Sequence, residues 1–207
     1  MAGIGKAKER CPVCDASLTL CMCAAVPRLD LRTKISLVIH HRELFRSSNT
    51  GLLAHRALVN SELRIRGDSR ETLDLSDLLL PRYRTLLFYP CADAVELDRD
   101  LVCQDPRPIQ LIVPDGTWRQ ARKIPARHHE LKEIPRVRIS TPNQGTFQLR
   151  AQSRPEGMAT LLAIACALRI IEGDLAATQL MKLYQDRVAR TLKARGLLRE
   201  NSEWGVR

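Results

Sequence analysis

Hydrophobic and polar positions along the chain follow two kinds of pattern. Short runs rich in apolar residues, many of them β-branched, occur at 35–39, 85–89 and 109–113, and the segment 136–139 is interpreted as a fourth strand. Longer stretches carry apolar residues at the three- and four-residue spacing of amphipathic helices. Short strands that alternate with helices are typical of an α/β fold. The pattern therefore predicts a mostly parallel sheet with helices on both faces.

Three helical stretches stand out. The first opens at Asn49-Thr50-Gly51 and carries apolar residues at Leu52, Leu53, Ala57, Leu58 and Leu63. The second, 158–171, is apolar almost all round, which predicts a helix buried in the fold or at a subunit interface. The third is amphipathic through Leu180, Leu183, Tyr184, Val188 and Leu192, and Gly196 is expected to end it.

Polar and turn-forming residues follow the predicted strands. They are the segments 40–43, 89–90, 114–118 and 140–145, and Pro90 and Pro114 are expected to stop the second and third strands. In a parallel sheet the crevice at the carboxyl ends of the strands is the usual ligand site. The sequence therefore predicts a site at this edge, although His40 and His41 there are equally compatible with one core and one surface histidine.

Charge and composition narrow the class of protein. The 207 residues carry a net charge of +10, which favours a polyanionic partner. Only 4% of the residues are aromatic, so RNA contacts should involve phosphate and shape more than stacked bases. The first ten residues lack an apolar core, and no apolar run approaches the roughly 20 residues that span a bilayer. These features predict a soluble protein without a membrane partner.

Seven cysteines include a compact group of four, Cys11, Cys14, Cys21 and Cys23. Four thiolates at this spacing favour a structural zinc site; an iron–sulfur cluster and metal-free thiols are the alternatives. A closed four-sulfur site leaves no position for catalysis, so its role would be to fold the N-terminal segment. We expect a zinc-binding module and linker at 1–30, a second domain at 31–207, and a reducing, cytoplasmic location.

Asp115-Gly116-Thr117-Trp118 directly follows the third predicted strand. Gly116 permits a tight turn, and Thr117 with Gln120 fits a capping box. Asp115 is then either a local cap or a base held near the following Arg119, Arg122 and Lys123. The segment 47–51 similarly fits helix capping. Arg150 and Arg154 are compatible with binding a carboxylate or phosphate, or with simple solvation.

Together these residues resemble the DTW-domain family over nearly the whole chain. The resemblance is carried by the four cysteines, Ser48-Asn49-Thr50-Gly51, Asp115-Gly-Thr-Trp118 with its basic helix, and Leu149-Arg150. It implies a SPOUT-like fold with a C-terminal trefoil knot, packed against helix 158–171. It also implies a tRNA-uridine aminocarboxypropyltransferase that uses S-adenosyl-L-methionine. Family members often carry Glu after the Thr that begins this helix, whereas Leu161 follows Thr160 here.

The resemblance also implies roles for individual residues. Asp115 would be the catalytic base, and phosphates of tRNA would bind Arg119, Arg122, Lys123 and Arg154. The expected cofactor-binding residues are Tyr89, Pro90, Pro114, Gly116, Thr117, Trp118, Leu149, Arg150 and Thr160. Two rival functions stay open: a SPOUT-type RNA methyltransferase with the same cofactor, and a non-catalytic zinc-ribbon RNA-binding protein. DNA is not an expected partner, and the protein is expected to be a monomer or a homodimer.

Overall fold

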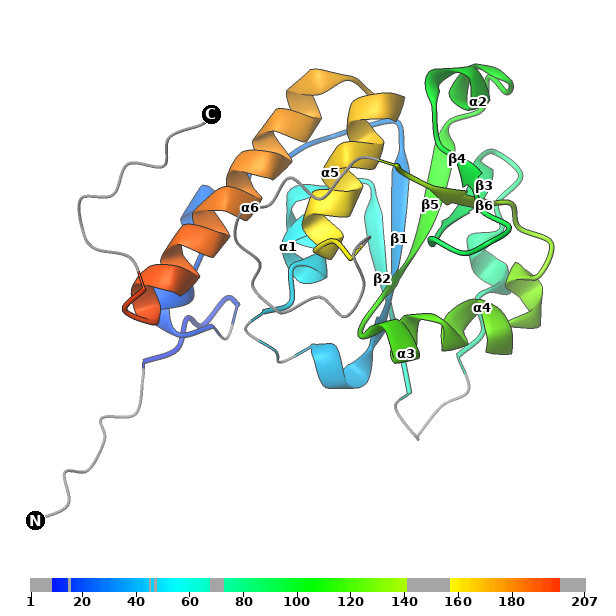
Figure 1. Ribbon diagram of the computed structural model, residues 1–207. Coiled ribbons are helices and arrows are strands. Elements are labelled where there is room, and N and C mark those ends of the chain that lie inside the picture. Colours follow the sequence, from blue (N-terminus) through cyan, green and yellow to red (C-terminus); the bar gives the residue numbers. More distant parts are fainter. Residues whose placement is uncertain are drawn as a thin grey trace, which may run out of the picture.

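The computed structural model describes residues 9–14, 16–44, 46, 48–67, 73–140 and 157–197. Six strands form one sheet in the order β2-β1-β5-β3-β6-β4, and every pairing between them is parallel. The strands are β1 (Lys34–His40), β2 (Ser61–Arg66), β3 (Arg84–Phe88), β4 (Val95–Glu96), β5 (Ile109–Asp115) and β6 (Arg136–Arg138). Their carboxyl ends therefore share one edge of the twisted sheet, and those of β1, β2 and β5 lie at the bottom of the sheet in Figure 1.

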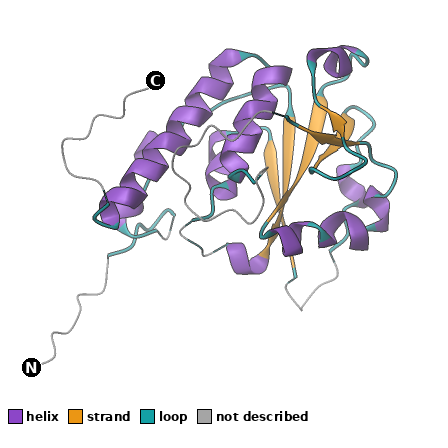
Figure 2. Ribbon diagram, viewed as in Figure 1, coloured by secondary structure: helices purple, strands orange, loops and turns teal. Residues whose placement is uncertain are grey.

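Helices cover both faces of this sheet, as predicted (Figure 2). One face packs against α1 (Gly51–Ala57), α5 (Thr160–Ile171) and α6 (Asp174–Ala194). The other packs against α3 (Trp118–Ala121) and α4 (Lys123–Arg127). The helix α2 (Arg99–Cys103) precedes β5. The described residues also form the short 3-10 helices η1 (Leu18–Leu20), η2 (Cys23–Ala25), η3 (His41–Glu43), η4 (Ser76–Leu78) and η5 (His129–Leu131).

Side chains of the central strand β5 alternate between the two hydrophobic cores. Leu111 and Val113 belong to the core beneath α5 and α6, whereas Ile112 belongs to the core beneath α4. Because successive side chains point to opposite faces, a strand covered on both sides must be apolar at consecutive positions. This explains why the runs 35–39 and 109–113 are largely apolar, with Ser36 and Gln110 as the exceptions. The helix α5 lies within the fold, between the sheet and α6 (Figure 1). Of the two predicted positions, inside the fold or at a subunit interface, the structure shows the first.

The predicted helix that included Leu63 is wrong at its carboxyl end. The helix α1 stops at Ala57, and Leu63 lies in β2 opposite Leu37 of β1. β2 escaped prediction because it is an edge strand in which polar and apolar residues are mixed, so its apolar positions are too few to show a period. β4 also escaped prediction, since two residues give no pattern.

The third strand does not stop at Pro114, as had been expected, but continues through Asp115. Pairing of β5 with β3 ends at Ile112, whereas pairing with β1 continues to Asp115. Within the described strands Pro114 therefore has one neighbouring strand, where a missing N–H is tolerated. The extra two residues carry Asp115 to the very end of the strand.

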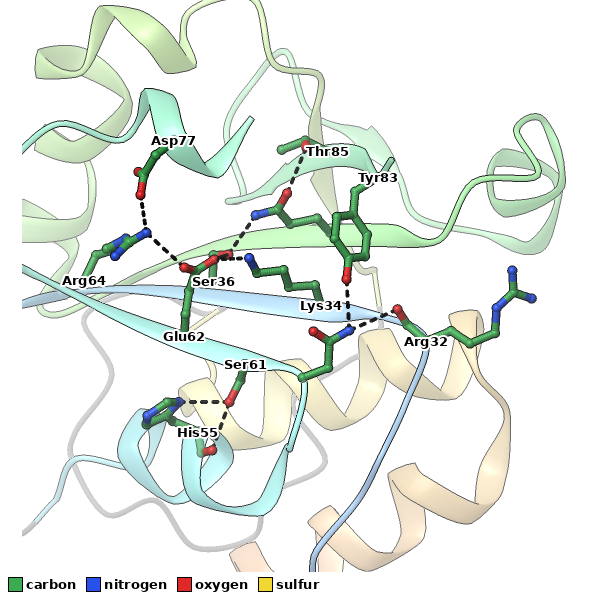
Figure 3. Close-up of polar contacts among 12 residues, drawn as sticks. Arg32, Lys34, Ser36, His55, Ser61, Glu62, Arg64, Asp77, Tyr83 and Thr85 are labelled. Atoms are coloured by element: carbon green, nitrogen blue, oxygen red, sulfur yellow. Dashed lines mark hydrogen bonds and ion pairs between the residues drawn. The ribbon is translucent and has the colours of Figure 1, made fainter. Parts of the chain in front are cut away.

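A chain of polar contacts crosses the amino-terminal half of the sheet (Figure 3). Thr85 donates to Gln110 Oε1, Gln110 Nε2 donates to Ser36 Oγ, and Ser36 Oγ donates to Glu62 Oε1 at 2.7 Å. Lys34 Nζ lies 2.6 Å from the same Glu62 oxygen. The buried Ser36 and Gln110 side chains thus both have partners, which removes most of the free-energy cost of their burial.

The segment 141–156 lies outside the described residues, and with it Leu149, Arg150 and Arg154. The trefoil knot, which would involve this part of the chain, stays a prediction, as does the division into domains at residue 30. In the part of the chain that the structure describes, no helix combines the length and the apolar character needed to cross a membrane.

Candidate functional site

Asp115 ends β5 and is 7% exposed. Its Oδ1 accepts a 2.5 Å hydrogen bond from Thr160 Oγ1, and its Oδ2 accepts a 3.2 Å bond from Asn49 Nδ2. Asn49 lies just before α1 and Thr160 begins α5, so the carboxylate joins three elements that are far apart in the sequence. This arrangement differs from a cap of the helix that follows Asp115, because the cap there is Thr117.

The segment before α1 is built around this carboxylate. Asn49 Oδ1 accepts the N–H of Leu52, which confirms the expected capping, while its amide group also donates to Asp115. A Cβ on Gly51 would lie 2.7 Å from Asp115 Oδ2 and 3.1 Å from Leu37 Cδ2. Glycine is therefore required for this close approach. The local sequence of Ser48-Asn-Thr-Gly51 predicts only a helix start, whereas its contact with Asp115 is a feature of the tertiary structure.

The turn after Asp115 has the predicted form. Gly116 has φ +150°, and Thr117 Oγ1 accepts the N–H of Gln120 while Gln120 Oε1 accepts the N–H of Thr117. This capping box fixes the start of α3 and hence the direction of Trp118. The cap is structural, and it places the Trp118 side chain at a defined position beside the carboxyl end of β5.

Trp118 and Tyr89 form an aromatic pair at this edge. Their ring centroids are 6.2 Å apart with an interplanar angle of 56°, within the range of favourable tilted pairs. Tyr89 is buried in the core under α4, whereas Trp118 is half-buried. Pro90 and Pro114 are also half-buried at the ends of neighbouring strands. The described members of the expected cofactor-binding set thus gather at one edge of the sheet.

Basic side chains extend from the same turn. Arg119, Arg122 and Lys123 lie on α3 and at the start of α4, and all three are exposed. Their positions are open to solvent, as phosphate contacts require. Arg154 and the expected cofactor residues Leu149 and Arg150 lie outside the described residues.

The four N-terminal cysteines form a candidate metal centre. Their sulfur atoms all lie within 4.8 Å of one another, with Cys11 and Cys23 at 3.9 Å and Cys14 and Cys21 at 3.7 Å. Four sulfurs bound at about 2.3 Å to a tetrahedral zinc ion lie about 3.8 Å apart. The cluster can therefore hold a metal ion, and its spacing fits four-sulfur coordination.

Arginines attach this cysteine cluster to the helices. Arg187 of α6 donates to the carbonyl of Leu20, and Arg190 donates to the carbonyl of Cys21 at 2.8 Å. Arg56 of α1 lies 3.7 Å from Cys23 Sγ through Nη1. Burial lowers the pKa of Arg187, and the neighbouring cysteines oppose that shift. Positive charge here suits a thiolate-rich centre, and it joins the N-terminal segment to the face covered by α6 (Figure 1).

Comparison with known proteins gives three similarities. The DTW domain family model matches residues 8–192. A protein of Drosophila melanogaster named tRNA-uridine aminocarboxypropyltransferase 2 is 28% identical over 172 residues, which cover 80% of this chain and 67% of that protein. The protein of the same name from Macaca fascicularis is 25% identical, over 81% of this chain and 58% of its own length.

Among solved structures, the SAM-dependent rRNA:acp-transferase Tsr3 from Vulcanisaeta distributa aligns with a TM-score of 0.46 and 16% identity, covering 79% of each chain. The match to the macaque relative covers 58% of the length of that protein, so this chain spans little more than half of it. Because the family model extends from before the cysteine cluster to the last turn of α6, the chain belongs to the DTW domain family.

Proposed function

We propose that this protein transfers the 3-amino-3-carboxypropyl group of S-adenosyl-L-methionine to N3 of a tRNA uridine and releases 5′-methylthioadenosine. The names of its relatives support the reaction class. The observation that carries the proposal is the position of Asp115. It is a buried carboxylate at the carboxyl edge of a parallel sheet, held at both oxygens and followed by an aromatic and three cationic residues.

The reaction joins uridine N3 to the γ-carbon of the aminocarboxypropyl chain. The bond from that carbon to sulfur breaks, and its electron pair neutralises the sulfonium, which leaves as a thioether. The N3–H proton must be removed, and Asp115 is the proposed acceptor. Asn49 and Thr160 would keep the carboxylate in one orientation during this transfer. Positioning also selects the reacting carbon, because three carbons on the sulfonium are electrophilic.

The remaining site residues have proposed roles that rest on their placement and on the family resemblance. Tyr89, Pro90, Pro114, Gly116, Thr117, Trp118 and Thr160 would bind the S-adenosyl-L-methionine, together with Leu149 and Arg150. Arg119, Arg122, Lys123 and Arg154 would bind tRNA phosphates. Cys11, Cys14, Cys21 and Cys23 would hold a structural zinc ion, and the cytosol, which keeps thiols reduced, is the proposed compartment.

The spent cofactor tests the reaction class. Purified protein, unmodified tRNA and S-adenosyl-L-methionine are incubated, and the small-molecule products are separated by chromatography. The proposal predicts tRNA-dependent release of 5′-methylthioadenosine. Release of S-adenosylhomocysteine instead would assign the protein to the RNA methyltransferases. Binding of tRNA with no spent cofactor of either kind would favour a non-catalytic RNA-binding role.

A further inference from the structure

Arg66 is a buried cation at the carboxyl edge of the sheet. It is the last residue of β2, pairs in register with His40 of β1 and is 9% exposed. Among the described residues it has neither a hydrogen-bond acceptor nor an ion-pair partner. Most of the Arg66 side chain is withdrawn from water, and largely buried charges are normally paired. An arginine left in this state is suited to an anion that arrives with a ligand.

A second arginine and two imidazoles lie near Arg66. Burial and the charge of Arg127, the last residue of α4, lower the pKa of Arg66. Burial lowers the pKa of His40, and the charges of His41, Arg66 and Arg42 lower it further. The nearby carboxylate of Glu43 pairs with Arg46, with Nε and Oε1 3.3 Å apart. Arg66 and Arg127 are therefore two neighbouring cations, and their electrostatic repulsion disfavours the arrangement until an anion binds.

Gly67 leaves space beside these groups. Its φ of +84° favours glycine, and a Cβ there would lie 3.1 Å from His40 Nε2 and 3.2 Å from His41 Nδ1. The two imidazole rings are 4.6 Å apart, so both rings approach the surface of one glycine. Within the described residues the buried His41 Nδ1 has no hydrogen-bond partner. Glycine thus keeps a side chain out of a position that two imidazole nitrogens approach.

We infer that Arg66, Arg127 and His40 form a phosphate-binding subsite that takes a backbone phosphate of the substrate RNA. This inference rests on the proposed function for the identity of the RNA. Ile39 pairs in register with Asp115, so His40 lies one residue beyond the partner of the proposed base. A phosphate bound here would place RNA backbone next to the reaction centre and continue the basic surface formed by Arg119, Arg122 and Lys123.

The alternation of β1 separates this subsite from Asp115. His40 shares its face of the sheet with Val38, whose core lies under α4, whereas Asp115 contacts residues next to α1 and α5. The carboxylate of S-adenosyl-L-methionine has to lie close to its own reacting carbon, and hence close to Asp115. Two guanidinium groups also carry more positive charge than one carboxylate balances. A phosphate of the RNA is the better match.

Binding of an unmodified tRNA transcript, measured by fluorescence anisotropy without S-adenosyl-L-methionine, tests the subsite. Arg66→Gln and Arg127→Gln should each weaken binding about tenfold and reduce the slope of log K against log salt by about 0.7–0.9, the value for one lost phosphate contact. Arg99→Gln, which removes the same charge from exposed α2, should stay within about twofold of the unaltered protein. Arg66→Lys should retain most of the affinity.

Two further readouts separate this role from a structural one. The Tm of Arg66→Gln should equal or exceed that of the unaltered protein, because the repulsion between Arg66 and Arg127 is removed. Affinity for S-adenosyl-L-methionine, measured by calorimetry, should be unchanged. The inference is overturned if both glutamine variants bind tRNA as Arg99→Gln does, or if they lose S-adenosyl-L-methionine and keep tRNA. Because no turnover is needed, a protein that binds tRNA but transfers no group would contradict the proposed function and leave this test valid.

Discussion

The hydroxyl of Thr160 donates a 2.5 Å hydrogen bond to Asp115 Oδ1, across 45 residues of sequence. The bond connects the first residue of α5 to the last residue of β5. Nearby, the N–H of Leu161 donates to Thr50 Oγ1 at 3.2 Å. The start of α5 is therefore attached both to the proposed base and to the residue preceding α1, so the packing of helices and the orientation of Asp115 depend on one another.

Replacement of Thr160 tests this dependence. Thr160→Val removes the hydroxyl with little change of shape and leaves Asp115 Oδ1 without this donor. A hydrogen bond to a charged group contributes about 1.5–3 kcal/mol, so the free energy of unfolding in urea should fall by about that amount. Thr160→Ser keeps the donor and should lose much less. Equal stability of the two variants would mean that the hydroxyl does not hold the carboxylate.

Gly51→Ala should be strongly destabilising and should abolish transfer. Its Cβ would meet Asp115 Oδ2 at 2.7 Å, and that carboxylate is held at both oxygens and cannot easily move. Much of the destabilisation should disappear in an Asp115→Ala background, where the carboxylate is absent. A double-mutant cycle of unfolding free energies measures this coupling. If the two substitutions change the free energy of unfolding additively, the destabilisation by Gly51→Ala does not come from contact with Asp115.

Zinc should stabilise the fold through the four-cysteine cluster. We expect one zinc ion per chain by elemental analysis, and a marked fall of Tm on chelation, since metal binding is coupled to folding. Cys14→Ser should lower both the zinc content and the Tm. Cys103→Ser provides the matched control, because Cys103 is exposed on α2. Iron with sulfide in the purified protein, or a Tm indifferent to Cys14→Ser, would contradict this assignment.

The polar chain on the sheet predicts a dependence of stability on pH. Burial alone would raise the pKa of Glu62, but the bonds from Lys34 and Ser36 outweigh it and lower the pKa below its ordinary value. Ionised Glu62 therefore stabilises the folded state above about pH 4.5, and this contribution is lost as the pH falls through the lowered pKa. Glu62→Gln should consequently be less stable than the unaltered protein at pH 7.

The difference in stability between Glu62→Gln and the unaltered protein should become smaller as the pH falls below about 4.5, because the Glu62 side chain then becomes neutral as well. Tm measurements of both proteins at pH 7 and pH 4 check this prediction, with metal loss affecting both alike. A difference independent of pH would show that packing, and not charge, determines the effect of the substitution.

The sequence predicted the parallel sheet because the central strands β1 and β5 are covered on both faces and are therefore largely apolar. It missed β2, an edge strand in which Ser61, Glu62, Arg64 and Arg66 leave little apolar pattern. It found Asp115 from its place after a strand, but it assigned Asn49 to helix capping alone. The bond between Asp115 and Thr160 depends on tertiary packing across 45 residues, and no local pattern records it.

The most direct test of the proposed function is mass spectrometry of nucleosides from unmodified tRNA incubated with S-adenosyl-L-methionine and the protein, or with Asp115→Asn. The unaltered protein should produce a uridine carrying the aminocarboxypropyl group. Asp115→Asn should bind tRNA normally but transfer at least about 100-fold more slowly, because the proton acceptor is lost. Full transfer by Asp115→Asn, or a methyl group on the product, would contradict the account.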